Sequence, residues 1–220
     1  MWVLVPVKPL TQTKQRLRGV LTPTERQGLT LAMLQDVLTA AARATRPVGV
    51  LVVSRCPHVA MWARALGASV FAESVDVGLS AALTEASAYL VRHHGATGTL
   101  ILPSDVPLVT APDIDALLTR PDPVTLVPDH LGTGTNALVC SPPNAMRLHF
   151  GEGSLARHGQ AARAVGVAPL IVRNARISQD LDEPDDLWRV RDMGRASFAR
   201  TFLQRLALDE RLHGRRVLAC

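Results

Sequence analysis

Short apolar runs alternate along this chain with longer segments whose apolar residues recur at helical spacing. Uninterrupted runs at 48–54 and 100–102 are typical of strands that are covered on both faces in a parallel sheet. Residues 23 to about 44 predict a helix instead, because Thr22 and Glu25 form a capping-box pattern and an apolar face follows. This order of strand, helix and strand predicts right-handed crossovers and a mostly parallel central sheet flanked by helices.

The same patterns predict the remaining elements. Further strands are expected at 2–7, 69–71 and 124–127, and further helices at 58–66, about 79–93, 112–118, after Ser154 and after Pro184. Residues 1–190 therefore predict a single α/β domain. Residues 191–220 predict a basic, amphipathic helical extension, whose apolar side chains would pack on the domain or on a second copy, so a homodimer is one expectation.

The composition limits the class of protein. With 220 residues, 47% of them hydrophobic, the chain can bury a sizeable core. No apolar run approaches the roughly 20 residues that cross a bilayer, and no signal-peptide pattern is present, so a soluble cytoplasmic protein without a membrane partner is expected. Cys56, Cys140 and Cys220 are far apart in the chain, which favours free thiols over a zinc site or a disulfide framework.

The formal net charge of +5 is concentrated at the end of the chain. Residues 189–220 contain eight arginines and three acidic residues, which accounts for the whole excess. A non-enzymatic module that binds nucleic acid or another partner is therefore one hypothesis. Binding of nucleic acid is not expected, however, because the segment lacks interleaved aromatic residues suited to base stacking, and this hypothesis leaves the glycine loops and aspartates unexplained.

Lysine is rare in this chain and is confined to one loop. Lys8 and Lys14 are the only lysines among the 24 basic residues, and they share the polar segment after the first strand with Arg16. A strand that leads into a cationic loop is typical of phosphate sites, although the same side chains could form a solvated surface. Neither a Walker-type loop nor a Gly-x-Gly-x-x-Gly motif is present, so P-loop kinases and dinucleotide-binding dehydrogenases are not supported.

One carboxylate follows the most buried predicted strand. Asp105 comes after Pro103 and Ser104 at the carboxyl end of the run 100–102. Ligands of open α/β sheets collect beyond the carboxyl ends of the strands, so Asp105 is a candidate catalytic residue. The alternative is that Asp105 only caps the next helix.

The candidates for nucleotide contacts also include Pro103 and Ser104 before Asp105, together with one strand end and one helix start. Ser54 ends the 48–54 strand, and Gly78 and Ser80 open the helix at about 79–93. The free amide groups at the start of that helix could receive a phosphate or ribose oxygen.

Two glycine-containing loops follow. Gly132 and Gly134 allow backbone amides to converge, and Thr133, Thr135 and Asn136 add side-chain donors, so the first loop is either an anion nest or an ordinary hairpin turn. The second loop, residues 150–158, contains Gly151 and leads into a helix with Ser154 at its start. His158 in the first turns of that helix is expected to be an ordinary surface histidine.

A last acidic segment precedes Pro184. Asp180 and Asp182 alternate along an extended stretch, and clustered carboxylates of this kind often bind a divalent ion. Asp182 could instead cap the helix that begins at Pro184.

These motifs occur together in one order: Pro-Val-Lys-Pro-Leu, Leu-Pro-Ser-Asp-Val-Pro-Leu, Gly-Thr-Gly-Thr-Asn-Ala-Leu, Phe-Gly-Glu-Gly-Ser-Leu-Ala-Arg-His and Asp-Leu-Asp-Glu-Pro-Asp-Asp-Leu. Over residues 1–190 the chain closely resembles the guanylyltransferases of deazaflavin coenzyme biosynthesis, a family that includes 2-phospho-L-lactate guanylyltransferase. The resemblance implies a GT-A, Rossmann-like nucleotidyltransferase fold. It also implies transfer of GMP from GTP to a three-carbon phosphoacid: 2-phospholactate, phosphoenolpyruvate or 3-phosphoglycerate. A nucleotidyltransferase acting on a molybdopterin or a sugar phosphate is the enzymatic alternative.

The resemblance also implies roles for individual residues. Asp105 and Asp180 match the Mg²⁺ ligands, with Asp182 adjacent, and Lys8 and Lys14 match the lysines of the nucleotide loop. The acceptor-binding positions match Gly151, Ser154 and the Thr133, Thr135 and Asn136 region. Gly78-Leu-Ser80 departs from the family's usual Gly-Leu-Asn, so the resemblance does not carry a nucleotide contact over to the Ser80 side chain.

Overall fold

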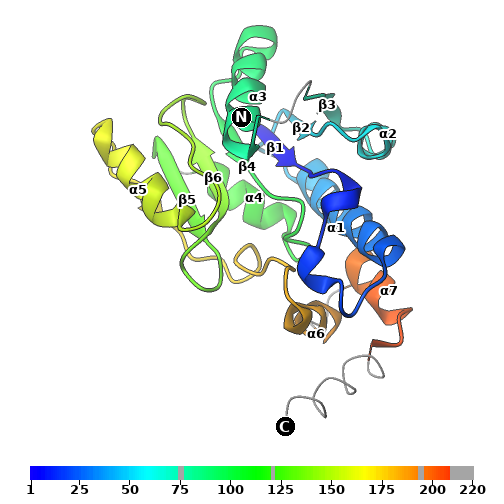
Figure 1. Cartoon of the computed structure of the whole chain (residues 1–220). Coiled ribbons are helices and arrows are strands. Elements are labelled where there is room, and N and C mark those ends of the chain that lie inside the picture. Colours follow the sequence, from blue (N-terminus) through cyan, green and yellow to red (C-terminus); the bar gives the residue numbers. More distant parts are fainter. Residues whose placement is uncertain (74–76, 120–121, 193–195, 209–220) are drawn as a thin grey trace.

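The computed structural model describes residues 1–73, 77–119, 122–192 and 196–208. The strands are β1 (Trp2–Pro6), β2 (Gly49–Val53), β3 (Ser69–Phe71), β4 (Thr99–Ile101), β5 (Val124–Pro128), β6 (Thr135–Cys140) and β7 (Leu170–Ile171). Within the described residues they form a seven-stranded sheet in the order β3-β2-β1-β4-β6-β5-β7 (Figure 1). The mostly parallel α/β architecture predicted from the sequence is confirmed.

Helices connect these strands at the predicted positions. They are α1 (Pro23–Arg43), α2 (Pro57–Ala65), α3 (Leu79–His94), α4 (Ala111–Leu118), α5 (Ser154–Ala164), α6 (Pro184–Asp192) and α7 (Phe198–Gln204), with short 3-10 turns η1 (Leu10–Gln12) and η2 (Gln15–Leu17) in the first loop. The capping box that starts α1 is present, because Thr22 and Glu25 each accept a hydrogen bond from the other's backbone amide. A second capping box, between Thr110 and Asp113, starts α4.

The sheet has one reversed strand. Pairing is parallel among β3, β2, β1 and β4 and between β5 and β7, whereas β6 runs antiparallel to both of its neighbours. The first glycine loop is therefore a hairpin turn and not an anion nest: Asp129 N donates to Gly134 O at 3.2 Å, and Thr133 N donates to Asp129 Oδ1 at 2.8 Å. Because β6 is reversed, its first residues lie at the same edge as the carboxyl ends of the parallel strands.

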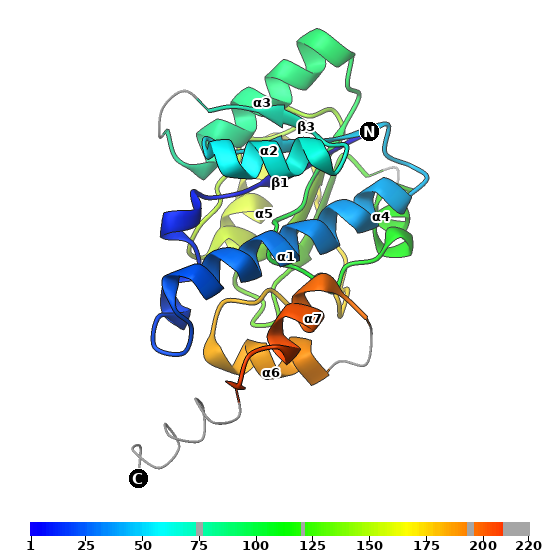
Figure 2. The ribbon, with the colours of Figure 1, turned by 90° about the vertical axis from the view of Figure 1, so that its right-hand side faces the viewer.

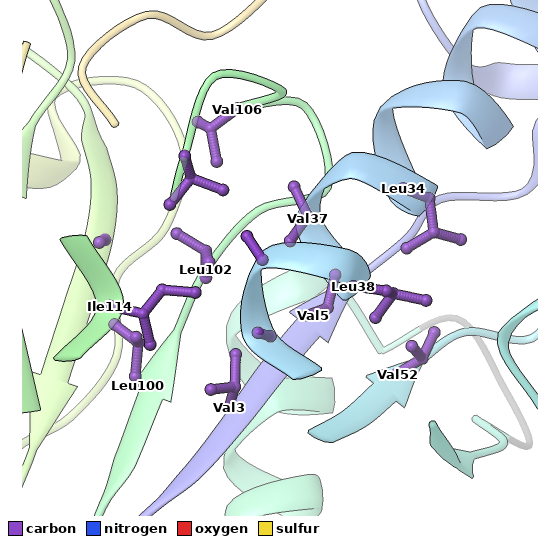
Figure 3. Close-up of a cluster of buried hydrophobic side chains, with 14 of the residues drawn as sticks. Val3, Val5, Leu34, Val37, Leu38, Val52, Leu100, Leu102, Val106 and Ile114 are labelled. Carbon is purple, nitrogen blue, oxygen red and sulfur yellow. The ribbon is translucent and has the colours of Figure 1, made fainter. Parts of the chain in front are cut away.

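Alternating side chains of the strands fill two apolar layers. Val3 and Val5 of β1 point toward Leu34 and Val37 of α1, as Figure 3 shows, and this layer also includes side chains of α2 and α4. Leu4 lies on the opposite face of β1, in the layer that α3 and α5 cover. Each such fully buried side chain contributes about 1.5–3 kcal/mol of hydrophobic stabilisation, so these layers hold the strand ends rigidly in place.

A third apolar cluster joins α6 and α7 to α1 (Figure 2). It includes Leu29 and Leu203, and the absence of a side chain at Gly28 leaves room for the ring of Phe202 beside α1. The described part of the predicted extension therefore packs on the body of the protein. Residues 193–195 and 209–220, which hold several of the tail arginines and Cys220, lie outside the described residues. Within the described part of the chain, none of the helices combines the length and apolar character needed to cross a membrane.

Candidate active site

The loop after β4 presents Asp105 to a lysine from the first loop. Lys14 Nζ lies 2.8 Å from Asp105 Oδ2 and 2.6 Å from Asp182 Oδ1, so it bridges two carboxylates that are distant in the sequence. Asp105 does not cap α4, because the side chain of Thr110 has that role. The carboxylate of Asp105 is therefore held at the edge of the sheet by charge.

Lys14 reaches this position through an unusual backbone. It lies between η1 and η2 with φ at 49°, in the left-handed region, which costs a residue with a side chain about 1–2 kcal/mol. Its side chain is only 6% exposed. Burial acts to lower the pKa of Lys14, but the charges of Asp105 and Asp182 outweigh burial and raise the pKa, so the ammonium group stays protonated.

Backbone and side-chain hydrogen bonds bring the acidic segment to the same edge. Leu181 N donates to the backbone oxygen of Asp105 at 3.0 Å, and Ser178 Oγ donates to Pro128 O at 2.7 Å. Asp182 does not cap α6, because the side chain of Asp186 accepts hydrogen bonds from the amides of Asp182 and Glu183. The Asp182 carboxylate is therefore available to bond to Lys14. Burial acts to raise the pKa of Asp182, but the positive charge and hydrogen bond of Lys14 have the larger effect and lower it.

Asp180 lies beside these groups and is held by Asn136. Asn136 Nδ2 donates to Asp180 Oδ1 at 2.9 Å and to Ile177 O at 3.1 Å, so both amide hydrogens are used within the protein. This differs from the expectation that the Asn136 side chain donates to the acceptor, and it makes Asn136 a support for Asp180. Burial, together with the negative charges of Asp105 and Asp182, raises the pKa of Asp180.

The predicted metal ligands thus lie at one edge of the sheet, and Lys14 bridges two of them, Asp105 and Asp182. Among the residues that the structure describes, no three His, Cys, Asp or Glu side chains are close enough together to hold a metal ion by themselves. The donor chemistry fits Mg²⁺, because Asp105, Asp180 and Asp182 supply carboxylate oxygens at one edge and their mutual repulsion already acts on Asp180.

The other cationic side chains of the first loop are exposed. Lys8 points into solvent, and Arg16 Nη1 lies 2.8 Å from Glu183 Oε1 in an exposed ion pair. A cavity of about 490 Å³ lies next to this loop, lined by residues that include Gln12 and Arg55. Polyanions could therefore reach Lys8 and Arg16, whereas the Lys14 ammonium group is already paired with the carboxylates of Asp105 and Asp182.

The remaining predicted nucleotide contacts lie after β2, at the start of α3 and beside β4. Ser54 directly follows β2 and accepts a hydrogen bond from Cys56 N at 3.2 Å. Gly78 is the exposed N-cap of α3, and Ser80 Oγ accepts a hydrogen bond from Phe150 N at 2.9 Å. Ser80 therefore links α3 to the second glycine loop. Pro103 and Ser104 are half-buried between β4 and Asp105.

The predicted acceptor residues fall into two groups. Thr135, at the start of β6, and Ser154, at the start of α5, are both buried, and Ser154 Oγ donates to Thr135 Oγ1 at 3.3 Å. Gly151 accepts a hydrogen bond from Ser154 N and has φ at 117°, a conformation that favours glycine. Thr133 instead lies in the exposed hairpin turn, where its hydroxyl bonds to Asp129.

The expectation of an ordinary surface histidine at position 158 is wrong. His158 is fully buried, with Nδ1 at 3.0 Å from Thr135 Oγ1 and its ring centroid 4.7 Å from that of Phe150. A sequence signal for this position exists, because residues four apart share one face of a helix and His158 lies four residues after Ser154.

Comparison with known proteins identifies the family. The model described as "Guanylyl transferase CofC like" matches residues 1–216. A phosphoenolpyruvate guanylyltransferase of Rubrobacter xylanophilus is 41% identical over 196 residues, which cover 88% of this chain and 94% of that protein. A 2-phospho-L-lactate guanylyltransferase of Methanothermobacter thermautotrophicus is 34% identical over 206 residues, covering 92% and 89% of the two chains.

Solved structures with little sequence identity share the fold. A nucleotidyl transferase from Methanothermobacter has a TM-score of 0.64 at 19% identity, covering 91% of this chain and 99% of that one. The 4-diphosphocytidyl-2C-methyl-D-erythritol synthase has a TM-score of 0.61 at 13% identity, covering 86% and 96%. Since the family model and close relatives match most of its length, the chain belongs to the CofC-like guanylyl transferase family and is a guanylyltransferase.

Proposed function

We propose that this protein transfers GMP from GTP to a three-carbon phosphoacid, with phosphoenolpyruvate as the first candidate, in deazaflavin coenzyme biosynthesis. Relatives named phosphoenolpyruvate guanylyltransferase, at 41% and 35% identity, support this acid as the acceptor. The observation that carries the proposal is the contact between Asn136 and Asp180. Asn136 follows Thr135 in β6, so this contact makes the acidic residues at the sheet edge neighbours of the buried hydroxyl groups of Thr135 and Ser154.

The reaction needs no general base. A phosphate monoester has a second pKa near ~6, so at neutral pH the acceptor phosphate is already an anionic nucleophile. Its oxygen attacks the α-phosphorus of GTP, a new phosphorus–oxygen bond forms, and the bond to the leaving pyrophosphate breaks. The obstacle is the repulsion between two polyanions, so the protein contributes mainly position and positive charge.

The exposed cations suit the nucleotide. Lys8 and Arg16 neutralise phosphate oxygens of GTP, and the backbone amides in the first turn of α3 are a second group of candidates for phosphate contacts. Lys14 has a different role from the one that the resemblance implies. It orients Asp105 and Asp182, which its ammonium group bridges.

Mg²⁺ would be held by Asp105 and Asp180, with Asp182 adjacent. When bound, the ion neutralises and orients phosphate oxygens. Asn136 keeps Asp180 turned toward this edge through its 2.9 Å hydrogen bond. On the acceptor side, Thr135 donates from its hydroxyl group, which also accepts from Ser154 Oγ at 3.3 Å, and the loop at Gly151 allows the acid to approach the backbone closely.

Pyrophosphate release tests the proposal directly. The purified protein is assayed with GTP and Mg²⁺ against phosphoenolpyruvate, 2-phospholactate and 3-phosphoglycerate, with ATP and CTP as nucleotide controls and mass spectrometry of the product. We expect release with GTP and phosphoenolpyruvate and a product that contains GMP joined to the acid. Release with 2-phospholactate alone would show that 2-phospholactate, and not phosphoenolpyruvate, is the acceptor. The absence of release with all three acids would overturn the proposal.

A further inference from the structure

His158 occupies the junction between β6 and the second glycine loop. Its side chain is 0% exposed, and both ring nitrogens are within hydrogen-bond distance of a partner. Nδ1 lies 3.0 Å from Thr135 Oγ1, and Nε2 lies 2.9 Å from the backbone nitrogen of His149. The imidazole therefore connects the strand that carries Thr135 to the loop that precedes Gly151.

These partners fix the tautomer of the ring. A backbone N–H can only donate, so Nε2 must accept the hydrogen bond from His149 and carries no hydrogen. Burial, together with the electrostatic influence of His149 and Arg157, lowers the pKa of His158 to about 4, and the ring is neutral at physiological pH. The single ring hydrogen is therefore on Nδ1, which donates to Thr135 Oγ1.

The Thr135 hydroxyl can then take part in only one further hydrogen bond, as a donor. Its oxygen accepts from His158 Nδ1 and from Ser154 Oγ, which occupies both of its acceptor positions. The described residues provide no acceptor for the hydroxyl's own hydrogen. A buried donor without a partner costs about 1–3 kcal/mol, and a negatively charged oxygen of a ligand would remove that cost.

We propose that His158 is a positioning residue for acceptor recognition: its Nδ1–H holds the Thr135 hydroxyl so that Thr135 donates to an anionic oxygen of the phosphoacid. This inference rests on the proposed function, which assigns Thr135 and Ser154 to the acceptor. It adds a residue that does not touch the acid and acts only through Thr135. The same ring also packs against Phe150, so a packing role has to be separated from the hydrogen-bonding role.

Two amide substitutions separate these roles. The Asn side chain can carry its NH₂ group near the position of Nδ1, whereas the Gln side chain carries its carbonyl oxygen near the position of Nε2. His158→Asn therefore keeps the donor to Thr135 and loses the acceptor for His149, and His158→Gln does the reverse. Steady-state kinetics with GTP and phosphoenolpyruvate measure KM for each substrate in both variants.

The hydrogen-bonding role predicts that the two variants differ in KM for the acid. His158→Gln should raise KM for the acid about tenfold, since a hydrogen bond to a charged group is weakened, and should leave KM for GTP within about twofold of wild type. His158→Asn should keep KM for the acid within about threefold of wild type. An unchanged KM for the acid in His158→Gln, or equal increases in both variants, would overturn the inference.

Two controls keep this outcome distinct from failure of the proposed function. Ser154→Ala should raise KM for the acid because it removes the second hydroxyl group that holds Thr135 Oγ1, and if it does not, the proposed acceptor site fails whatever His158 does. If His158→Gln does not fold, ¹⁵N-histidine NMR of the wild-type protein still tests the inference. We expect a hydrogen on Nδ1 of His158, and a hydrogen on Nε2 would overturn the proposal.

Discussion

Lys14 Nζ lies 2.6 Å from Asp182 Oδ1, although 168 residues separate the two in the chain. The same nitrogen bonds to Asp105 at 2.8 Å, so one ammonium group ties the first loop to the loop after β4 and to the segment before α6. The left-handed backbone of Lys14 adds a local cost that these ion pairs offset.

Removal of one carboxylate charge at the sheet edge should stop turnover without unfolding the protein. Asp105→Asn keeps the shape of the side chain but removes the charge that Lys14 and a cation share. We expect kcat/KM to fall by about 100-fold or more, equivalent to about 2.7 kcal/mol of transition-state stabilisation. Pyrophosphate release measures the rate, and the melting temperature verifies folding. Asp185→Asn on the exposed side of α6 is the matched control, and near-native turnover of Asp105→Asn would contradict the assignment.

Loss of the Lys14 ammonium group should destabilise the protein in metal-free buffer. Lys14→Met leaves Asp105 and Asp182 close to each other without a shared cation, and we expect a loss of about 2 kcal/mol in the free energy of unfolding, since both carboxylates are only partly buried. Urea denaturation in EDTA measures this loss.

The second lysine of the loop is the control for that experiment. Lys8 is exposed, so Lys8→Met should leave the unfolding free energy unchanged while it raises KM for GTP. Equal stability of the Lys14→Met and wild-type proteins would show that the bridging ion pairs contribute nothing measurable.

Stability at acid pH should depend on Asp113, which lies outside the candidate site. Burial alone would raise the pKa of Asp113, but the hydrogen bonds that it accepts, first that from Arg176, lower the pKa to about 2. A carboxyl whose pKa is lower in the folded state stabilises the protein above its unfolded pKa of 3.8, and this contribution is lost as the pH falls from about 4 toward 2. The shift is worth about 2 kcal/mol.

Comparison of Asp113→Asn with wild type isolates this contribution. The wild-type protein should lose stability more steeply than the variant between about pH 4 and pH 2 in urea denaturation, and the two curves should converge at the acid end. Parallel curves for the two proteins would contradict the role of Asp113. An exposed carboxyl such as Asp185 serves as the control position.

The packing of α7 on α1 should make one helical glycine hard to replace. An added Cβ at Gly28 would lie 2.7 Å from Phe202 Cε2. Gly28→Ala gains about 1 kcal/mol of helix propensity but costs about 1–3 kcal/mol through overpacking, so we expect a net loss of about 1 kcal/mol. In a Phe202→Ala background the same substitution should stabilise the protein. A stabilising Gly28→Ala in the wild-type background would mean that α7 does not pack as described.

Most of the fold follows from local patterns in the sequence. The capping box at Thr22 predicts the start of α1, and the apolar run at 100–102 predicts the central position of β4. The reversed strand β6 is not predicted, because its polar first residues continue the glycine loop and its direction depends on which strands it joins. Residues 128–139 therefore fit a loop as well as a strand when only the sequence is considered.

The sequence predicts which residues belong to the candidate site, but it does not predict which of them contact each other. The rarity of lysine singles out Lys14, and the acidic motif singles out Asp182, yet neither pattern indicates that the two side chains bond to each other. Burial decides the remaining cases: His158 has the sequence context of a surface residue on α5, and only the fold puts the Phe150 ring and Thr135 beside it. A polar residue's role thus depends on partners that sequence spacing does not reveal.

The reversed direction of β6 has a consequence for how acceptor preference can diverge among related proteins. The β5–β6 hairpin and α5 form a continuous part of the chain, whereas Lys8, Lys14 and Asp105 come from earlier segments. With the acceptor held as proposed, a change of acid would be confined to one exchangeable stretch, residues 124–164. A chimera that takes this stretch from a relative with a different acid would keep its own nucleotide half and inherit the other protein's selectivity.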